Sequence, residues 1–368
     1  MKKTGFAIVL VLAAAALLYF ILRPAGRIPT TAGEKPVVRF GVSLNLSGDM
    51  PRRGQAVRKA MTLALDEINA NPENIFDYDL VFEDDAMSPA QAAVNASKLI
   101  SHDRVNVLFT FLQGPAYAVN PIAEEAKTVA FHGSYDPRLS AGEYNFQNMV
   151  SAGELNTEIG RFAQRKGVKK AVLLFQAGDG RREAAALLKG QLEKAGIEVS
   201  ESFYGGENGD FEKTAAAVKE MLPDMVVLSG AGRGLELAAE ALAAQGVGGV
   251  KAGIDIINFA ENPEVFDGFY SIGARQGDQA FRDKMENDFT FYSAYYYDDM
   301  HILHGIFERL GAQNGRVVPA ADEIAAELLK EKGFAGAAGK ASLTESGQFY
   351  SGAAVYKLKN GRLTEENQ

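Results

Sequence analysis

Short apolar runs alternate with segments of helical periodicity from residue 37 to about residue 270. Residues 37–44 form one apolar run; after an Asn-Leu-Ser-Gly turn, Val57, Met61, Leu65 and Ile68 recur at the spacing of one helix face. The same alternation predicts strands at residues 37–44, 78–85, 105–111, 128–133, 144–150, 171–175, 197–204, 225–229 and 250–257. Helices are expected between them, at about residues 57–68, 88–101, 117–127, 155–163, 183–195, 211–222 and 235–245.

Strands separated by helices of about 10–15 residues indicate parallel sheets built from βαβ units. The alternation divides into two series, at about residues 37–150 and 150–270, which predicts two doubly wound α/β lobes. In such sheets the ligand binds past the carboxyl ends of the strands. The loops at those ends are residues 47–53, 113–117, 132–138, 176–182, 230–234 and 255–258. Two of them are rich in glycine, which either offers backbone amides to an anion or only makes a tight turn.

The amino end has a different pattern. Lys2 and Lys3 precede an uncharged apolar run at residues 5–22, which would be about 27 Å long as a helix. This run is either an uncleaved membrane anchor or the core of a cleaved signal, for which the best cleavage site follows Ala32. Residues 23–36 contain proline, glycine and threonine and indicate a linker. In both cases we expect the body of the protein to be exported.

Composition narrows the classes of function. The chain has 368 residues and no cysteine, which excludes disulfides, thiolate zinc sites, a cysteine nucleophile and a lipid-modified cysteine. The net charge is −9, and an acidic protein lacks the basic footprint that a nucleic-acid backbone requires. We therefore expect no nucleic-acid partner.

Catalytic motifs are mostly missing. Neither a nucleophile elbow nor a phosphate loop occurs, and the glycine-rich residues 230–234 lack the further glycine at Leu235 that a dinucleotide site requires. His301 and His304 could hold a metal, although a core helix with polar edges explains them better. Residues 84–85, both aspartate, could act as an acid/base pair or be structural. We expect no enzymatic activity, no cofactor and no metal.

Several stretches resemble one family of binding proteins. Residues 39–48 (Arg-Phe-Gly-Val-Ser-Leu-Asn-Leu-Ser-Gly), 54–56 (Gly-Gln-Ala) and 64–69 (Ala-Leu-Asp-Glu-Ile-Asn) follow the pattern with which the leucine/isoleucine/valine-type substrate-binding proteins of ABC transporters begin. Residues 81–100 resemble that family's second strand and helix, and residues 339–361 its closing strands. The similarity spans residues 37–368.

The resemblance implies the type I fold of periplasmic binding proteins, with two doubly wound parallel-sheet lobes joined by a hinge that the chain crosses three times. One lobe would hold residues 37–148 and 272–346, and the other residues 149–271 and 347–368. It also implies that ligand binds between the lobes, that hinge closure buries it, and that the closed form docks on a separate permease chain.

The ligand loops depart from the amino-acid-binding pattern of that family. The loop after the third strand reads Gln113-Gly114-Pro115-Ala116, with no hydroxyl, and Tyr135 stands near the usual threonine. Residues 232–234 (Gly-Arg-Gly) occupy the region where an acid for the ligand ammonium is expected. Arginine is the preferred partner of carboxylates and phosphates. Its presence on these loops indicates an anionic or carboxylate-bearing ligand, unless the arginines are simply solvated.

The candidate ligand-binding residues all lie on crevice loops. They are Arg52, Arg53, Gln113, Gly114, His132, Ser134, Tyr135, Arg181, Arg182, Arg233 and Asp255. We expect an extracytoplasmic solute-binding protein that captures a small carboxylate-bearing or amino-acid-like ligand for an ABC importer, at the outer face of the membrane or in the periplasm. The alternatives are a ligand-sensing domain that acts on a partner protein and, less favoured, an extracytoplasmic enzyme.

Overall fold

The computed structural model describes residues 34–48, 50–350, 352–360 and 362–366. The predicted anchor or signal at residues 5–22 and most of the linker lie outside the described residues. Within the described part of the chain, no helix combines the length and apolar character needed to cross a bilayer.

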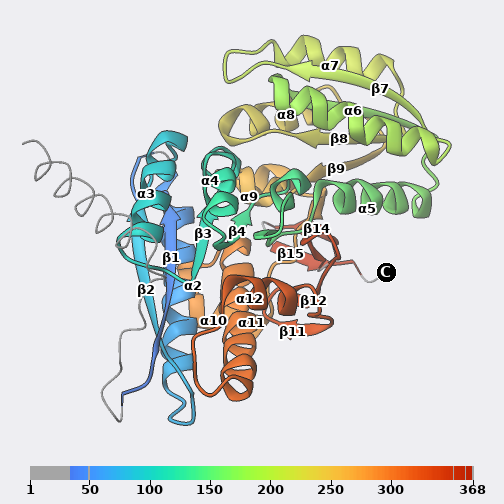
Figure 1. Cartoon of the computed structure of the whole chain (residues 1–368). Helices are drawn as coiled ribbons and strands as arrows, with labels where there is room; N and C mark the ends of the chain where they lie inside the picture. Colours follow the sequence, from blue (N-terminus) through green and yellow to red (C-terminus); the bar gives the residue numbers. More distant parts are fainter. Residues whose placement is uncertain (1–33, 49, 351, 361, 367–368) are drawn as a thin grey trace, which may run out of the picture. The chain divides into compact units, whose positions relative to one another are not determined.

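The first lobe contains a five-stranded parallel sheet in the order β2-β1-β3-β4-β5 (Figure 1). Every residue of its central strands β3 and β4 is buried, which is typical of a sheet that helices cover on both faces. The elements are β1 (Val37–Leu44), α2 (Pro51–Asn69), β2 (Asp77–Asp84), α3 (Pro89–Ser101), β3 (Val107–Phe111), α4 (Gln113–Glu125), β4 (Val129–Gly133), η1 (Pro137–Ser140) and β5 (Asn145–Gln147).

The second lobe contains a seven-stranded sheet in the order β15-β14-β10-β9-β8-β6-β7. Strands β6 to β10 run parallel, whereas β14 and β15 are antiparallel to their neighbours. The elements are α5 (Ala152–Arg165), β6 (Lys170–Gln176), α6 (Asp179–Lys194), β7 (Glu198–Tyr204), α7 (Phe211–Glu220), β8 (Met225–Ser229), α8 (Gly232–Ala244), β9 (Val250–Ile254), α9 (Ile256–Phe259), η2 (Pro263–Phe266), β10 (Tyr270–Gly273), β14 (Ala354–Lys359) and β15 (Arg362–Glu365).

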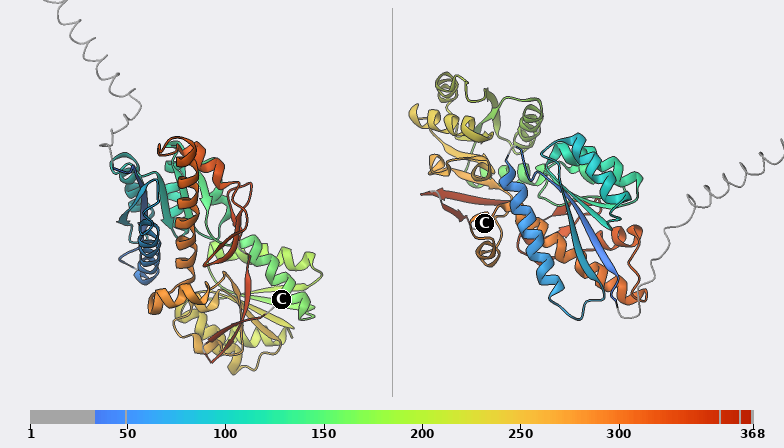
Figure 2. Two further views of the ribbon diagram at one scale, coloured as in Figure 1. Left: turned by 90° about the horizontal axis from the view of Figure 1, so that it is seen from below. Right: turned by 90° about the vertical axis from the view of Figure 1, so that its left-hand side faces the viewer.

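A distant segment returns to complete the first lobe. It comprises α10 (Gln279–Met285), η3 (Glu286–Asp288), α11 (Phe291–Gln313), α12 (Ala321–Leu328), β11 (Phe334–Gly336), β12 (Gly339–Leu343) and β13 (Phe349–Tyr350). Both views of Figure 2 show the orange α10 and α11 beside the blue elements of the first lobe. Between ring centroids, Phe307 of α11 lies 6.0 Å from Phe40, and Tyr296 of α11 lies 6.1 Å from Phe109. Helix α11 therefore packs against one face of the sheet.

This topology confirms the predicted fold class. The chain passes between the lobes three times, after β5, after β10 and after β13. The residue bounds that the sequence suggests for the lobes stay a prediction.

Several element boundaries differ from the sequence-based ones. Helix α4 begins at Gln113 rather than near residue 117, because Pro115 falls in the first turn, where a missing N–H is tolerated. Strand β9 ends at Ile254, since Asp255 adopts the left-handed conformation with φ of 47°. The predicted helix start near residue 88 agrees with the structure, in which Ser88 caps α3 and its hydroxyl accepts a hydrogen bond from the amide of Gln91.

Candidate functional site

The two lobes contact each other through the loops at the carboxyl ends of their strands. Tyr135 follows β4 of the first lobe, and its hydroxyl donates a hydrogen bond to the carboxylate of Asp255, which follows β9 of the second lobe. Asp255 is only 1% exposed, and its other oxygen accepts from the amide of Ala274 at 3.0 Å. The bond therefore joins residues 120 positions apart in the sequence and spans the predicted crevice.

Burial controls the ionisation of this pair. It raises the pKa of Asp255 to about 7, although the hydrogen bonds from Tyr135, Ala274 and Asn258 favour the charged carboxylate. Burial, together with the charge of Asp255, also raises the pKa of Tyr135 well above its ordinary value. At neutral pH the tyrosine is therefore a hydrogen-bond donor, and the carboxyl group is close to its titration midpoint.

Arg53 makes the second contact between the lobes. It lies in the first turn of α2, and its Nη2 donates to the backbone oxygen of Asn258 at 3.0 Å. Its guanidinium carbon lies 5.0 Å from the ring centroid of Phe259, within the range of a cation–π interaction. Among the described residues, no carboxylate approaches the guanidinium within 4.0 Å. The remaining donors of the planar fork can thus bind a ligand carboxylate.

Aromatic rings surround these contacts. Tyr135 stacks on Phe291 of α11 at 6.4 Å between centroids, with an interplanar angle of 18°. Tyr292 lies 4.8 Å from Phe111 in an edge-to-face arrangement. Burial raises the pKa of Tyr292 despite the opposing charge of Arg53, so Tyr292 stays neutral. Phe291 is 1% exposed and Tyr292 4% exposed, so the lobe contact has apolar, buried surroundings.

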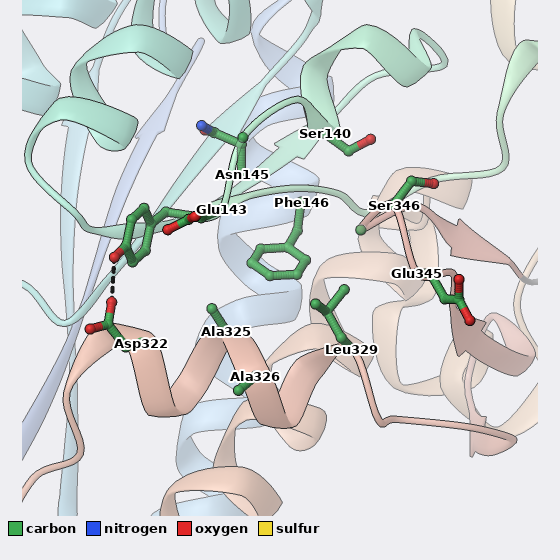
Figure 3. Close-up of a pocket in the computed structure, with 13 residues that line it drawn as sticks. Ser140, Glu143, Asn145, Phe146, Asp322, Ala325, Ala326, Leu329, Glu345 and Ser346 are labelled. Carbon is green, nitrogen blue, oxygen red and sulfur yellow. Dashed lines mark hydrogen bonds between the residues drawn. The ribbon is translucent and has the colours of Figure 1, made fainter.

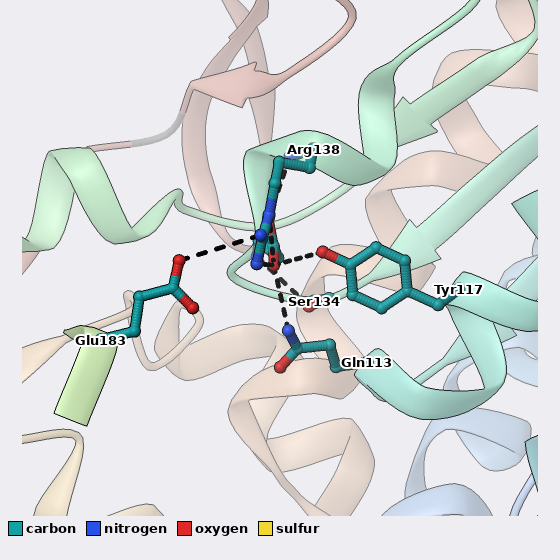
Figure 4. A network of polar contacts seen from close by, with 6 residues as sticks. Gln113, Tyr117, Ser134, Arg138 and Glu183 are labelled. Atoms are coloured by element: carbon teal, nitrogen blue, oxygen red, sulfur yellow. Dashed lines mark hydrogen bonds and ion pairs between the residues drawn. The ribbon is translucent and has the colours of Figure 1, made fainter. Parts of the chain in front are cut away.

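A polar network joins the same loop after β4 to side chains of α4 and α6 (Figure 4). Asp136 accepts hydrogen bonds from Gln113 Nε2 at 3.0 Å and from the Tyr117 hydroxyl at 2.6 Å, and it pairs with Arg138 through Nε and Nη2 at 2.9 and 2.6 Å. Hydrogen bonding from Arg138 lowers the pKa of Asp136 to about 2. Arg138 also lies 3.8 Å from Glu183 of α6, so this network forms a third link between the lobes.

Some predicted residues lie on the crevice loops but serve other contacts. His132 is fully buried, and its ring nitrogens bond Thr110 and Asn145, which leaves neither for a ligand. Ser134 accepts a hydrogen bond from the amide of Asp136 at 3.2 Å, and Gly114 is exposed in the first turn of α4.

The other four predicted arginines do not converge on Arg53. Arg52 donates to the backbone oxygen of Asn287 at 2.8 Å, and Arg182 lies over the ring of Phe203 at 4.3 Å. Burial raises the pKa of the Tyr204 hydroxyl, and the positive charge of Arg181 opposes this rise.

Arg233 pairs with Glu236 at 3.1 Å and Glu240 at 2.9 Å within α8. Because both acids follow at helical spacing, the sequence carried a signal for this pairing that the loop-based reading missed.

Other residues of this candidate site were not among the predicted ones. Asp136 and Arg138 stand in the predicted loop 132–138, and an acid–arginine pair there was a detectable signal. Tyr292 lies in a sequence cluster with Tyr295, Tyr296 and Tyr297, a pattern that reflects helix packing more often than a ligand platform. Asn258 contributes a backbone oxygen, which no sequence motif could have indicated.

Two hollows lie away from the lobe contacts. The first, about 520 Å³, lies between β5 and α12, with Phe146, Ala325 and Leu329 around it and Tyr144 bonded to Asp322 (Figure 3). The second, about 580 Å³, lies in the second lobe where its parallel strands begin. Neither includes a predicted site residue. No cluster of His, Asp or Glu suited to a metal ion occurs among the described residues, His301 and His304 included.

This chain is similar to a known protein family and to solved structures of binding proteins. A model of the family described as periplasmic binding protein matches residues 37–362. A branched-chain amino acid ABC transporter periplasmic ligand-binding protein from Burkholderia xenovorans has a similar fold, with a TM-score of 0.80 and 16% identity over 90% of this chain and 94% of that one. A solute-binding protein from R. palustris in complex with 4-hydroxybenzoate gives a TM-score of 0.73 and 18% identity over 90% and 96%.

A curated relative matches only about half of this chain. The gamma-aminobutyric acid type B receptor subunit 1 of Mus musculus is 26% identical over 186 residues, which are 48% of this chain. The match covers 19% of the receptor subunit, so this chain spans about a fifth of the length of that relative.

Proposed function

Because the chain belongs to the periplasmic binding protein family, we propose that it captures a small aromatic carboxylate between its two lobes. The observation that carries this proposal is Arg53, which lies over Phe259 at the lobe contact with no carboxylate partner among the described residues. The arginine fork would bind the ligand carboxylate, and Tyr135, Phe291 and Tyr292 would pack against its ring. The R. palustris protein, whose structure contains 4-hydroxybenzoate, has the same fold and supports this ligand class.

Family membership itself establishes an extracytoplasmic solute-binding protein. The binding mechanism we propose is closure of the lobes over the ligand. The Tyr135–Asp255 bond and the Arg138–Glu183 pair are contacts of the kind that would hold the lobes together. Closure would remove water from the site and strengthen the interaction between Arg53 and the ligand.

Calorimetry with benzoate, 4-hydroxybenzoate and leucine tests the ligand class. Loss of a charged hydrogen bond costs about 1.5–3 kcal/mol, which is about 10- to 150-fold in affinity. We expect Arg53→Gln to weaken binding of the aromatic acids by this factor. Arg52→Gln is the matched control, because Arg52 precedes it in the same helix but bonds Asn287. Equal affinities of the two variants, or failure of both aromatic acids to bind the wild type, would refute the proposal.

An α-amino acid is the second candidate, because Asp255 offers a buried carboxylate to a ligand ammonium. The protein from Burkholderia xenovorans is described as a binder of branched-chain amino acids and shares the fold. An ammonium group would lower the pKa of Asp255 from about 7 and release protons at neutral pH. The two ligand classes are therefore distinguished by whether the heat of binding depends on the ionisation enthalpy of the buffer.

The partner and the attachment are also part of the proposal. A permease in the membrane would receive the ligand from the closed form, and residues 5–22 would hold the protein at the outer face of the membrane. If so, the native protein stays in the membrane pellet at high salt and keeps its amino terminus. A soluble pool whose sequence begins at Gly33 would instead show a cleaved signal.

The alternative function as a sensing domain draws support from the similarity to a receptor subunit. Co-purification of the ligand-loaded protein with a permease, rather than with a signalling protein, would separate the two functions.

A further inference from the structure

The hollow in the second lobe has an unusual charge for this protein. It lies where β8, β9 and β10 begin, at the opposite end of the sheet from the lobe contacts, and has a volume of about 580 Å³. Lys166, Lys251 and Lys357 line it, and Asp224 is the one acidic residue among the described lining residues. A concentration of positive charge stands out in a chain whose net charge is −9.

The strand register brings the lysines together. Tyr270 of β10 pairs directly with Lys357 of the antiparallel β14, and on its other side with Ala252 of β9, the residue after Lys251. The ammonium of Lys357 lies 3.8 Å from the centroid of the Tyr270 ring, and that of Lys166 lies 4.8 Å from it. The tyrosine ring therefore holds two of the three cations around one hollow.

The acidic groups nearby leave much of this charge uncompensated. Asp224 accepts backbone hydrogen bonds from Lys169 and Lys170 at 2.8 and 2.9 Å, and Lys166 forms an ion pair with Glu366 at 2.7 Å. Within the described part of the chain, no carboxylate comes within 4.0 Å of the ammonium groups of the other two lysines.

The ammonium groups of Lys251 and Lys357 repel each other within the hollow. Burial, together with the charge of Lys357, lowers the pKa of Lys251. Among the described residues, Lys251 donates only to the backbone oxygen of Gly249, at 3.4 Å. Like charges held close together cost free energy, and an anion between them would offset that cost.

We propose that this lysine hollow, formed by Lys166, Lys251 and Lys357 around Tyr270, binds a phosphate group. Lysine ammonium groups act as point charges toward phosphate oxygens, and two or three of them match the double charge of a phosphate or a phosphomonoester. The site is separate from the lobe contacts, so it would act in addition to capture of the main ligand.

Calorimetry of the full chain in a non-ionic, phosphate-free detergent tests the site. The probes are inorganic phosphate and glycerol 3-phosphate, titrated at constant ionic strength, with chloride as the reference anion. We expect Lys251→Gln and Lys357→Gln each to weaken binding about tenfold or more, and Lys357→Arg to retain it because the charge is kept. Lys359→Gln is the matched control, since Lys359 is exposed on the same strand but does not line the hollow.

The two probes also identify the source of the phosphate, because preference for the ester indicates a phosphorylated metabolite and preference for the ion indicates free phosphate. Equal binding by the wild type and both glutamine variants, or no binding of either probe above the chloride reference, would overturn the proposal. Circular dichroism confirms that each variant is folded. Affinity for the crevice ligand should be unchanged in all of them, so failure of this site is distinguishable from failure of the proposed function.

Discussion

The buried carboxyl group of Asp255 should make the stability of the folded state depend on pH. It is held in the folded state with a pKa of about 7, against an ordinary value of 3.8. Below about pH 4 the group is protonated in both states and contributes nothing. As pH rises from about 4 to about 7, the unfolded chain releases its proton while the folded protein retains it, so the wild type loses stability. Above about pH 7 the loss is complete and constant.

The size of this loss follows from the two pKa values. Each pH unit between them costs the folded state about 1.4 kcal/mol, so the accumulated loss is at most about 4 kcal/mol. Asp255→Asn keeps the shape and an acceptor oxygen for the amide of Ala274, but it does not titrate. The free energy of unfolding of the variant, relative to wild type, should therefore rise by up to this amount between about pH 4 and pH 7.5.

Urea denaturation of the body, residues 34–368, followed by far-ultraviolet circular dichroism, measures this difference at each pH. Asp136→Asn is the control, because the pKa of Asp136 is lowered to about 2, so its effect is lost only as pH falls toward that value. The control difference should stay flat above about pH 5. A flat difference for Asp255→Asn over the same range would show that the group does not carry the proposed proton, and would refute the reasoning.

Three further substitutions test the packing of the first lobe, one lobe contact and the role of Arg233 in ligand binding. Gly133→Ala should destabilise the first lobe by about 1–3 kcal/mol, because a Cβ there would lie 2.1 Å from the buried hydroxyl of Tyr296; an unchanged melting temperature would contradict this. Glu183→Gln should change the free energy of unfolding by less than about 1 kcal/mol, since its pair with Arg138 is solvent-exposed; a larger loss in urea denaturation would show that the link is stronger than its geometry suggests. Arg233→Ala should leave ligand affinity within about twofold in calorimetry, because its guanidinium is engaged by acids of its own helix, and a loss near tenfold would return it to the site.

The alternation of strands and helices could be predicted from the sequence because it depends on neighbouring residues. A strand such as residues 107–111 is apolar throughout since both of its faces are covered, and a capping residue such as Ser88 acts on an amide three positions away. The predicted boundaries of elements were wrong where a residue type fits both a turn and the start of a helix. The glycine and proline at positions 114 and 115 are typical of a turn, but they occupy the first turn of α4.

The members of the candidate site depend on tertiary structure. The loops could be identified from the ends of the strands, and Arg53, Tyr135 and Asp255 were among the candidates, but no local pattern distinguishes Arg53 from Arg52 next to it. That distinction arises because α9 of the other lobe places Phe259 and the backbone oxygen of Asn258 against Arg53 alone. Hydrophobic periodicity predicts whether a side chain is buried. Which partner that side chain contacts depends on how the three chain crossings bring the two sheets together.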